Sequence, residues 1–194
     1  MMNVAVLALQ GAFAEHEHML ARLGVQCFEL REKSQLTERI DGLILPGGES
    51  TTQGKLLRET GLMEPLTQAI KHGLPTFGTC AGLILLANKL ANDDNVYFGA
   101  LDVTVKRNAY GRQLGSFETD LPVAGIGTVP AVFIRAPYVE KVGKGVQILA
   151  QYDGKVVAVR QGNLIATAFH PELTEDTKVH EYFVNMIANR KIDK

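Results

Sequence analysis

The sequence predicts an α/β fold with a mostly parallel central sheet and helices on both faces, and three patterns indicate it. Continuous apolar runs such as residues 3–9 are typical of strands buried on both faces. In the first half of the chain these runs alternate with helical patterns, as in parallel sheets. In the second half, short strands follow one another across turn residues, which predicts an added antiparallel set.

The first half opens with the strand 3–9, which Gln10-Gly11 interrupts. Helical spacing of apolar residues over 13–23 predicts a helix, and Gly24 suits its C-cap. The following elements are expected to be a strand at 25–30, a polar helical link, a strand at 42–45, a helix at 63–72 and a strand from Pro75 to Thr79. Ligands of such sheets bind at the carboxyl ends of the strands.

The second half reads as antiparallel strands and a closing helix. The strands are expected at 103–107, 132–135, 146–152, 155–160 and 164–169. Asp153-Gly154 predicts a hairpin with a type I′ turn, and the helix is expected from about residue 175 to 190. No repeat, linker or low-complexity stretch interrupts the chain, so residues 1–194 are predicted to form a single domain.

Composition narrows the class of protein. The 194 residues are 46% hydrophobic and 21% charged, which suits one domain that buries roughly 70% of its unfolded surface. The net charge of −1 and the lack of a basic run argue against nucleic-acid binding. No apolar stretch reaches the roughly 20 residues of a membrane span, and a strand rather than a signal peptide follows Met1. Cys27 and Cys80 form no disulfide framework, which predicts reduced thiols and a cytoplasmic protein.

Cys80 lies between a strand and a helix, in the pattern Gly-x-Cys-x-Gly of residues 78–82. This is the thiol version of the nucleophile elbow, a turn too tight for side chains on either flank. The helix that begins at Ala81 would place free N–H groups beside the sulfur and favour the thiolate. The Ala81 N–H would then point to where an oxyanion forms. The simpler alternative is a small buried cysteine at a helix start.

A partner base lies near the end of the chain. His170 follows an apolar strand, Pro171 stiffens the backbone, and Glu172 comes next. His170 can accept the Cys80 proton, and Glu172 can fix the imidazole tautomer and stabilise its cation. A solvated His and Glu in a loop is the alternative, but the elbow favours catalysis.

The loop 45–52 contains Gly47-Gly48 directly after a buried strand. This peptide could supply a second oxyanion N–H beside Cys80, and Ser50 or Thr51 could cap a following helix. An ordinary turn between strand and helix is the alternative. The loop is not a phosphate-binding loop, because no Gly-Lys-Ser/Thr follows.

The other histidines suggest no metal or redox cofactor. His16 and His18 are two residues apart on a helix and face different directions. His72 suits a helix C-terminus, and His180 has no thiol or carboxylate cluster near it in sequence. Cys27 is expected to be a packing residue. We expect no metal and no cofactor.

Six motifs resemble one family from end to end. They are Leu9-Gln10-Gly11, residues 46–52, residues 78–83, Arg107-Asn108-x-Tyr110-Gly111-Arg112-Gln113, Phe133-Ile134-Arg135-Ala136-Pro137 and residues 169–174. Together they resemble class I (triad) glutamine amidotransferases and, more narrowly, the glutaminase subunits of pyridoxal phosphate synthases. The agreement is loosest over 121–130, which we treat as a variable loop. The resemblance implies a flavodoxin-like, three-layer glutamine amidotransferase fold.

The resemblance implies that the chain hydrolyses L-glutamine to glutamate and ammonia. Cys80, His170 and Glu172 would be the catalytic triad, and the N–H groups of Gly48 and Ala81 would form the oxyanion hole. A separate pyridoxal phosphate synthase subunit would receive the ammonia and activate the glutaminase by reorienting the Gly-Gly peptide.

Carried over by motif position, substrate recognition falls to Gly47, Gly48, Glu49, Arg107, Ile134 and Arg135. An arginine can bind the α-carboxylate of glutamine bidentately, and Glu49 can offset its α-ammonium. Gln10, at the end of the first strand, is a possible interface residue that shapes the oxyanion loop.

Three alternatives stay open on sequence. The chain could be a triad glutaminase that serves a different synthase, which the 107–113 motif argues against. It could be a stand-alone cysteine hydrolase or DJ-1-like protein, although the acid there comes from elsewhere than a His-Pro-Glu tripeptide. It could also be a non-catalytic binding subunit, which the intact Cys80, His170 and Glu172 argue against.

Overall fold

A computed structural model describes residues 2–37, 39–91, 93–107 and 115–192. The apolar run after Asn3 forms a strand whose last four residues are fully buried, as its composition predicts. The first half contains β1 (Asn3–Leu7), α1 (Phe13–Arg22), β2 (Gln26–Leu30), a 3-10 turn (Lys33–Thr37), β3 (Gly42–Leu45), α2 (Ser50–Glu59), α3 (Met63–Lys71), β4 (Thr76–Thr79) and α4 (Ala81–Leu86).

The second half consists mostly of strands. It contains β5 (Ala87–Leu90), β6 (Leu101–Lys106), β7 (Ser116–Val123), β8 (Gly127–Ile134), β9 (Tyr138–Val142), β10 (Gln147–Tyr152), β11 (Lys155–Gln161), β12 (Leu164–Thr167), a 3-10 turn (Pro171–Leu173) and α5 (Lys178–Ile192). Asp153 and Gly154, both with positive φ, form the turn between β10 and β11. These positive φ angles are those of the type I′ turn that the sequence predicts.

One sheet of the described strands runs in the order β2-β1-β3-β4-β12-β11-β9-β6-β5, with β10 beside β11. The pairs from β2 to β12 are parallel, and β12, β11, β9 and β6 then pair antiparallel in turn. β7 and β8 pair with each other in a separate two-stranded sheet. The sheet therefore confirms the predicted parallel core with an added antiparallel set.

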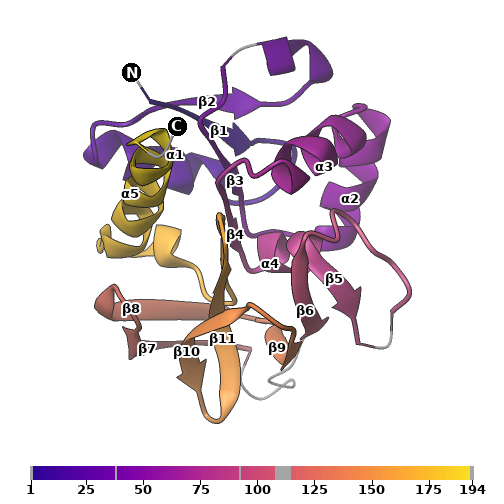
Figure 1. Cartoon of the computed structure of the whole chain (residues 1–194). Helices are drawn as coiled ribbons and strands as arrows, with labels where there is room; N and C mark the ends of the chain where they lie inside the picture. Colours follow the sequence, from indigo (N-terminus) through magenta and orange to yellow (C-terminus); the bar gives the residue numbers. More distant parts are fainter. Residues whose placement is uncertain (1, 38, 92, 108–114, 193–194) are drawn as a thin grey trace.

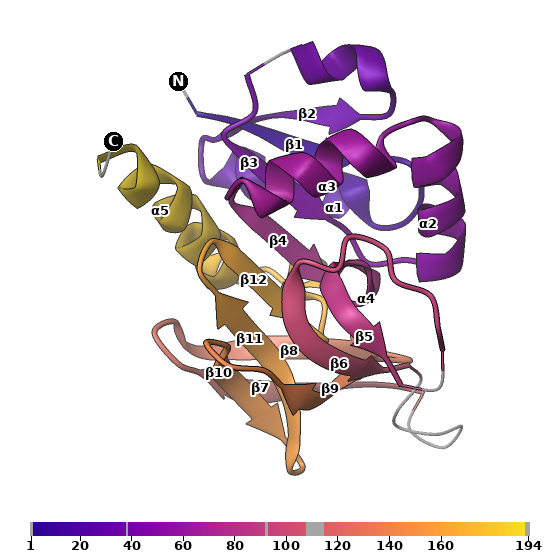
Figure 2. The same cartoon turned by 45° about the vertical axis from the view of Figure 1, so that its right-hand side comes forward.

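Helices cover both faces of the parallel part, which makes three layers. In Figure 1, α1 and α5 lie on one side of β3 and β4, and α2, α3 and α4 lie on the other. Figure 2 shows α3 crossing in front of β1 and β3, with the β7–β8 hairpin at the far end of the molecule. On the side of the sheet that α1 and α5 cover, the buried ring of Phe77 packs against Phe183 of α5.

The structure differs from the expectations in the second half. Residues 121–130 are not a loop: they form most of the β7–β8 hairpin, with a turn at 124–126. Pro122 and Pro130 suit strands of a two-stranded sheet, where a missing N–H is tolerated at the edge. Two further strands, β5 and β9, carried no clear signal in the sequence. β5 follows α4 directly, because Ala87 leaves the helical region with ψ of 140°.

Candidate active site

Cys80 stands on a sharp turn between β4 and α4, as its flanking glycines predict. Its φ is 49° and its ψ is −98°, a strained conformation for a residue with a side chain, and its N–H donates to the Thr167 carbonyl at 2.8 Å. A Cβ at Gly78 would lie 2.7 Å from the Gly82 backbone, and one at Gly82 would lie 2.2 Å from the Leu45 carbonyl oxygen. Only glycines therefore fit on both sides of the cysteine.

His170 lies at the end of β12, where the backbone turns into the 3-10 turn of Pro171. Its N–H donates to the Val132 carbonyl at 2.8 Å, which fixes the backbone, and its Nδ1 lies 2.7 Å from Oε1 of Glu172. Its side chain and that of Cys80 line the same cavity. Glu172 is 4% exposed, so the carboxylate lies behind the imidazole and away from solvent. The structure thus brings the three predicted catalytic side chains together.

The electrostatics of these three groups favour a charged imidazolium. Burial by itself would lower the pKa of His170, but hydrogen bonds and charge interactions with Cys80 and Glu172 raise it to about 10. Burial likewise opposes ionisation of Glu172, yet its interactions with His16 and His170, including the hydrogen bond with His170, hold the pKa of the carboxyl below its usual range. The raised pKa of His170 and the lowered pKa of Glu172 both indicate an ionised carboxylate paired with a protonated imidazole.

The Gly47-Gly48 loop packs directly on the histidine. A Cβ at Gly47 would lie 2.3 Å from Cε1 of His170, and the Gly47 carbonyl accepts from the Ala12 N–H at 3.0 Å. Gln10 holds the other side of the loop, because its Oε1 accepts from the Glu49 N–H at 2.8 Å. The loop is therefore fixed between the end of β1 and the triad.

A cavity of about 450 Å³ opens over the cysteine, at the carboxyl ends of β1, β3 and β4. Cys80 and His170 line it, and so do all the residues expected to bind substrate: Gly47, Gly48, Glu49, Arg107, Ile134 and Arg135. Gln10 also lines it. The six residues come from three separate segments of the chain, and the fold gathers them around one opening.

Two of these charged side chains are already partly engaged. The Arg107 guanidinium lies 3.4 Å from Oδ2 of Asp93 and donates to the Tyr97 hydroxyl at 3.1 Å. Its buried Nε has no hydrogen-bond partner among the described residues. Glu49, not Ser50 or Thr51, is the N-cap of α2: its carboxylate accepts from the N–H groups of Thr51 and Thr52. Arg135 is exposed and has a positive φ of 41°.

Residues 6–189 match the model of a family described as the SNO glutamine amidotransferase family. The chain belongs to this family. The membership confirms the resemblance that the six motifs indicate. The fourth motif is only partly visible in the structure, since Asn108, Tyr110, Gly111, Arg112 and Gln113 lie outside the described residues.

Curated relatives of this glutamine amidotransferase cover nearly its whole length. Three of them, all named pyridoxal 5'-phosphate synthase subunit PdxT, show this. The protein of Bifidobacterium longum is 59% identical over 93% of this chain and 98% of its own length, and that of Desulfitobacterium hafniense is 57% identical over 98% of this chain and 96% of its own length. The protein of Streptococcus pneumoniae is 50% identical over 95% of this chain and 97% of its own length.

Solved structures agree with the fold. One described as a glutamine amidotransferase has a TM-score of 0.91 and 48% sequence identity, and covers 95% of this chain and 98% of its own. PurLQS from Thermotoga maritima has a TM-score of 0.71 at 17% identity, covers 95% of this chain and 98% of its own, and shows likeness of fold alone. These structures confirm the predicted fold class.

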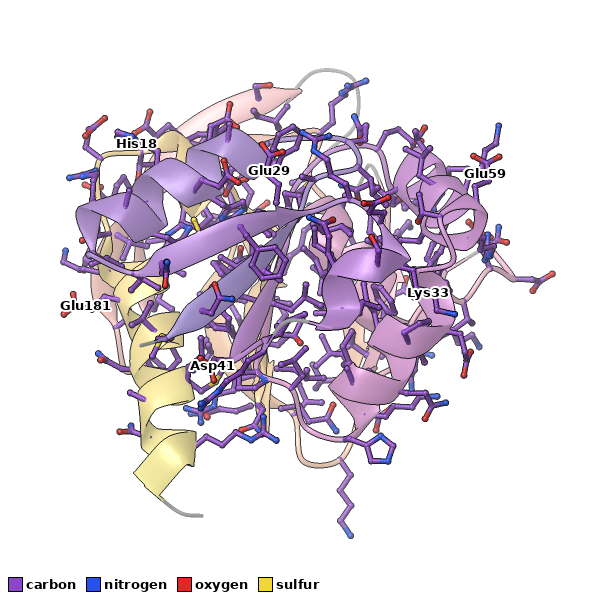
Figure 3. All side chains as sticks on the ribbon, turned by 90° about the horizontal axis from the view of Figure 1, so that it is seen from above. His18, Glu29, Lys33, Asp41, Glu59 and Glu181 are labelled. Carbon is purple, nitrogen blue, oxygen red and sulfur yellow. The ribbon has the colours of Figure 1, made fainter. Side chains whose placement is uncertain are left out.

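The sequence reasoning missed a polar cluster behind the triad. The sequence predicts no site at His16 or His180, yet their rings meet: Nδ1 of His16 lies 2.9 Å from Nε2 of His180, and Nε2 of His16 lies 3.1 Å from Oγ1 of Thr79. His16 does face away from His18, which lies at the outer surface of α1, as Glu181 does on α5 (Figure 3). The available signal was that His16 and His180 fall at core-facing positions of their helices.

The described part of the chain contains no group of three His, Cys, Asp or Glu side chains placed to hold a metal ion. It also contains no helix long and apolar enough to cross a membrane.

Proposed function

We propose that this glutamine amidotransferase hydrolyses L-glutamine to L-glutamate and ammonia, and passes the ammonia to a synthase subunit that makes pyridoxal 5'-phosphate. The observation that carries the proposal is the position of His170, which lines the 450 Å³ cavity together with Cys80 and has Oε1 of Glu172 2.7 Å from its Nδ1. Relatives named pyridoxal 5'-phosphate synthase subunit PdxT, at 50 to 59% identity, support the pathway.

The first half-reaction forms a thioester. His170 already carries its proton before the reaction, as its raised pKa requires, and the sulfur of Cys80 attacks the side-chain amide carbon of glutamine as the thiolate. The tetrahedral oxyanion then collapses, the C–N bond breaks, and the His170 imidazolium protonates the departing nitrogen to give ammonia. The raised pKa of His170, to about 10, keeps this proton available at neutral pH.

The second half-reaction returns the enzyme to its starting state. Neutral His170 takes a proton from water, the hydroxide attacks the thioester carbon, and glutamate leaves as the C–S bond breaks. Glu172 stays ionised throughout and stabilises the imidazolium in both steps. Both steps pass through an oxyanion, for which the N–H groups of Ala81 and Gly48 are the proposed donors.

The cavity supplies charges that suit a free amino acid. Arg107 and Arg135 are the proposed partners of the glutamine α-carboxylate, and Glu49 is the proposed partner of its α-ammonium. The bonds from Thr51 and Thr52 to Glu49 outweigh its burial and lower the pKa of its carboxyl, which keeps it negative. Ile134, Gly47 and Gly48 are proposed to line the side-chain amide.

We further propose that the synthase subunit gates the oxyanion hole and that the complex works in the cytoplasm. The Gly47-Gly48 loop lies at the cavity rim beside Gln10, so a protein that docks there can reorient the peptide. A non-catalytic subunit is the second candidate. The strained backbone at Cys80, which packing alone would not require, favours the catalytic proposal.

Replacement of Cys80 tests the proposal. We expect Cys80→Ala, assayed with the synthase subunit present, to lose ammonia release from L-glutamine by at least about 1,000-fold, because no other thiol reaches the cavity. Cys27→Ala is the matched control: it removes the other cysteine, from the half-buried face of β2, and should keep wild-type activity. Equal ammonia release by the Cys80 and Cys27 variants would contradict the proposal.

A further inference from the structure

Behind the triad lies a cluster of four polar side chains from four separate elements: His16 of α1, Thr79 of β4, Glu172 after β12 and His180 of α5. His16, Thr79 and His180 are fully buried, and Glu172 is 4% exposed. Burying so many polar atoms without solvent costs stability unless each has a partner. Apolar side chains would fill this space without that desolvation cost, so the polar cluster suggests a role in the active site.

Thr79 stands at the centre of the cluster. Its hydroxyl donates to Oε1 of Glu172 at 3.2 Å, and it accepts from the Gly47 N–H at 3.0 Å. His16 Nε2 approaches the same hydroxyl at 3.1 Å, and lies 3.6 Å from Oε1 of Glu172. One hydroxyl therefore contacts the oxyanion loop, the triad carboxylate and the histidine pair.

The chemistry of these groups allows one direction for the protons. The ionised carboxylate of Glu172 can only accept, so the single Thr79 proton points to it. The Thr79 oxygen then accepts from the Gly47 N–H and from the Nε2–H of His16. Neutral His16 is left with a lone pair on Nδ1, which accepts from the Nε2–H of His180. Neutral His180 ends the chain with an Nδ1 that has no hydrogen-bond partner in the described ranges.

Both histidines are held in the neutral form that this arrangement requires. Burial lowers the pKa of His16, against the opposing attraction of the Glu172 charge. Burial and the nearby His16 lower the pKa of His180 to about 3. Every hydrogen of the chain thus points from α5 through α1 and β4 toward the triad carboxylate.

From this geometry we infer that Thr79 is a positioning residue that couples the Gly47-Gly48 loop to Glu172, and that the His16–His180 pair sets the direction of its hydroxyl. The inference rests on the proposed glutaminase activity. Glu172 receives two donors on one oxygen, from His170 and from Thr79. If the loop shifts and the Gly47 N–H no longer binds the Thr79 hydroxyl, the orientation of that hydroxyl changes. The hydroxyl orients the Glu172 carboxylate, and the carboxylate in turn orients the imidazole of His170.

The first test removes the hydroxyl without changing the side-chain shape. Thr79→Val, assayed with glutamine and the synthase subunit, should lower kcat by about 10- to 100-fold and leave KM within about 2-fold, since the lost hydrogen bond is to a charged group. Thr79→Ser restores the hydroxyl and should recover most of kcat. Thr76→Val is the matched control, because Thr76 is equally buried on β4 and its hydroxyl donates only to the Leu74 carbonyl.

The second test asks whether His16 acts through Thr79. His16→Gln keeps a donor near the Nε2 position and should retain kcat within about 3-fold, whereas His16→Leu should fall about 10-fold. In the Thr79→Val background, His16→Leu should lower kcat by less than a further factor of about 2, because the interaction that it removes is already absent. Melting temperatures identify any variant that fails to fold. If Thr79→Val does not fold, the comparison of His16→Gln with His16→Leu tests the inference instead.

Wild-type kcat in Thr79→Val, loss of activity in Thr79→Ser equal to that in Thr79→Val, or additive effects of the two sites would each overturn the inference. Absence of ammonia release by the wild-type protein with the synthase subunit would instead overturn the proposed function. The wild-type assay therefore separates the two failures.

Discussion

Gly47 and Cys80 show how single positions set the geometry of the site. The Gly47 backbone lies against the His170 ring with no space for a Cβ, and Cys80 holds a positive φ that few residues tolerate. These positions carry readable sequence signals, because glycines on both sides of a cysteine and two successive glycines after a strand are uncommon. Gly47, Gly48 and Cys80 could therefore be predicted from the local sequence, whereas Arg107, Ile134 and Arg135 follow only from the resemblance of their motifs to the family.

The Thr79 cluster could not be predicted in the same way. His16 and His180 are 164 residues apart in the chain, and only the packing of α1 against α5 brings their rings together. A histidine on the buried face of a helix looks the same in sequence whether it fills space or holds a proton. The two roles can be distinguished only when the neighbours in three dimensions are known. The same holds for the contacts of Arg107 with Asp93 and Tyr97, which the sequence does not reveal.

The protonation state of His170 can be tested at the level of this single residue. With a pKa of about 10, the imidazole should stay protonated below that pH and lose its proton as the pH rises through it. Glu172→Gln removes the negative charge that raises this pKa, so the transition should move down by about 1 to 3 pH units. The Cε1–H signal of His170 in an NMR titration measures it, assigned by its loss in His170→Asn. An unchanged midpoint in Glu172→Gln would contradict the role given to the carboxylate.

At the scale of elements, the loop between β3 and α2 is held at both ends. Ala12 and Gln10 bind it from the end of β1, and the buried Gln53 of α2 donates to the Gln10 and Pro46 carbonyls at 2.8 and 3.1 Å. The segment after β1 and the helix α2 therefore fix the proposed oxyanion loop from two sides. The proposed docking of a synthase subunit on this loop would act on its fixation by Gln10.

Gln10→Ala tests this arrangement. The substitution removes the acceptor of the Glu49 N–H, and we expect the synthase-stimulated rate of ammonia release to fall by about 3- to 10-fold, the value of one hydrogen bond. Gln68→Ala, on the exposed face of α3 and bonded there to Glu64, is the control that should leave the rate unchanged. Full stimulated activity in Gln10→Ala would end the role proposed for Gln10.

The strands of the second half show where element prediction fails. Alternation of strands and helices made the parallel core predictable, since each βα unit has its own turn signals. The β7–β8 hairpin contains two prolines and turn-forming glycines, which read as a loop although the strands pair in register from Ser116–Ile134 to Val123–Gly127. Cross-strand packing of Phe117 on Phe133, with ring centroids 4.6 Å apart, contributes to this pairing and is invisible in local sequence.

At the scale of the whole molecule, the two halves contribute different parts of the site. The parallel half carries Cys80 and the Gly47-Gly48 loop, while the second half delivers His170 and Arg135 to the same cavity. The segments that follow β8 and β12 therefore both contribute to the proposed active site, which supports the prediction that residues 1–194 act as one domain.

The central claim is a triad glutaminase that a synthase subunit activates. The most direct measurement is the rate of ammonia release from L-glutamine by the wild-type chain, with and without the pyridoxal phosphate synthase subunit. We expect a low rate for the chain alone and a rate at least about 10-fold higher in the complex, since one oxyanion donor typically changes the rate by about 100- to 1,000-fold. Equal rates with and without the synthase subunit would contradict it.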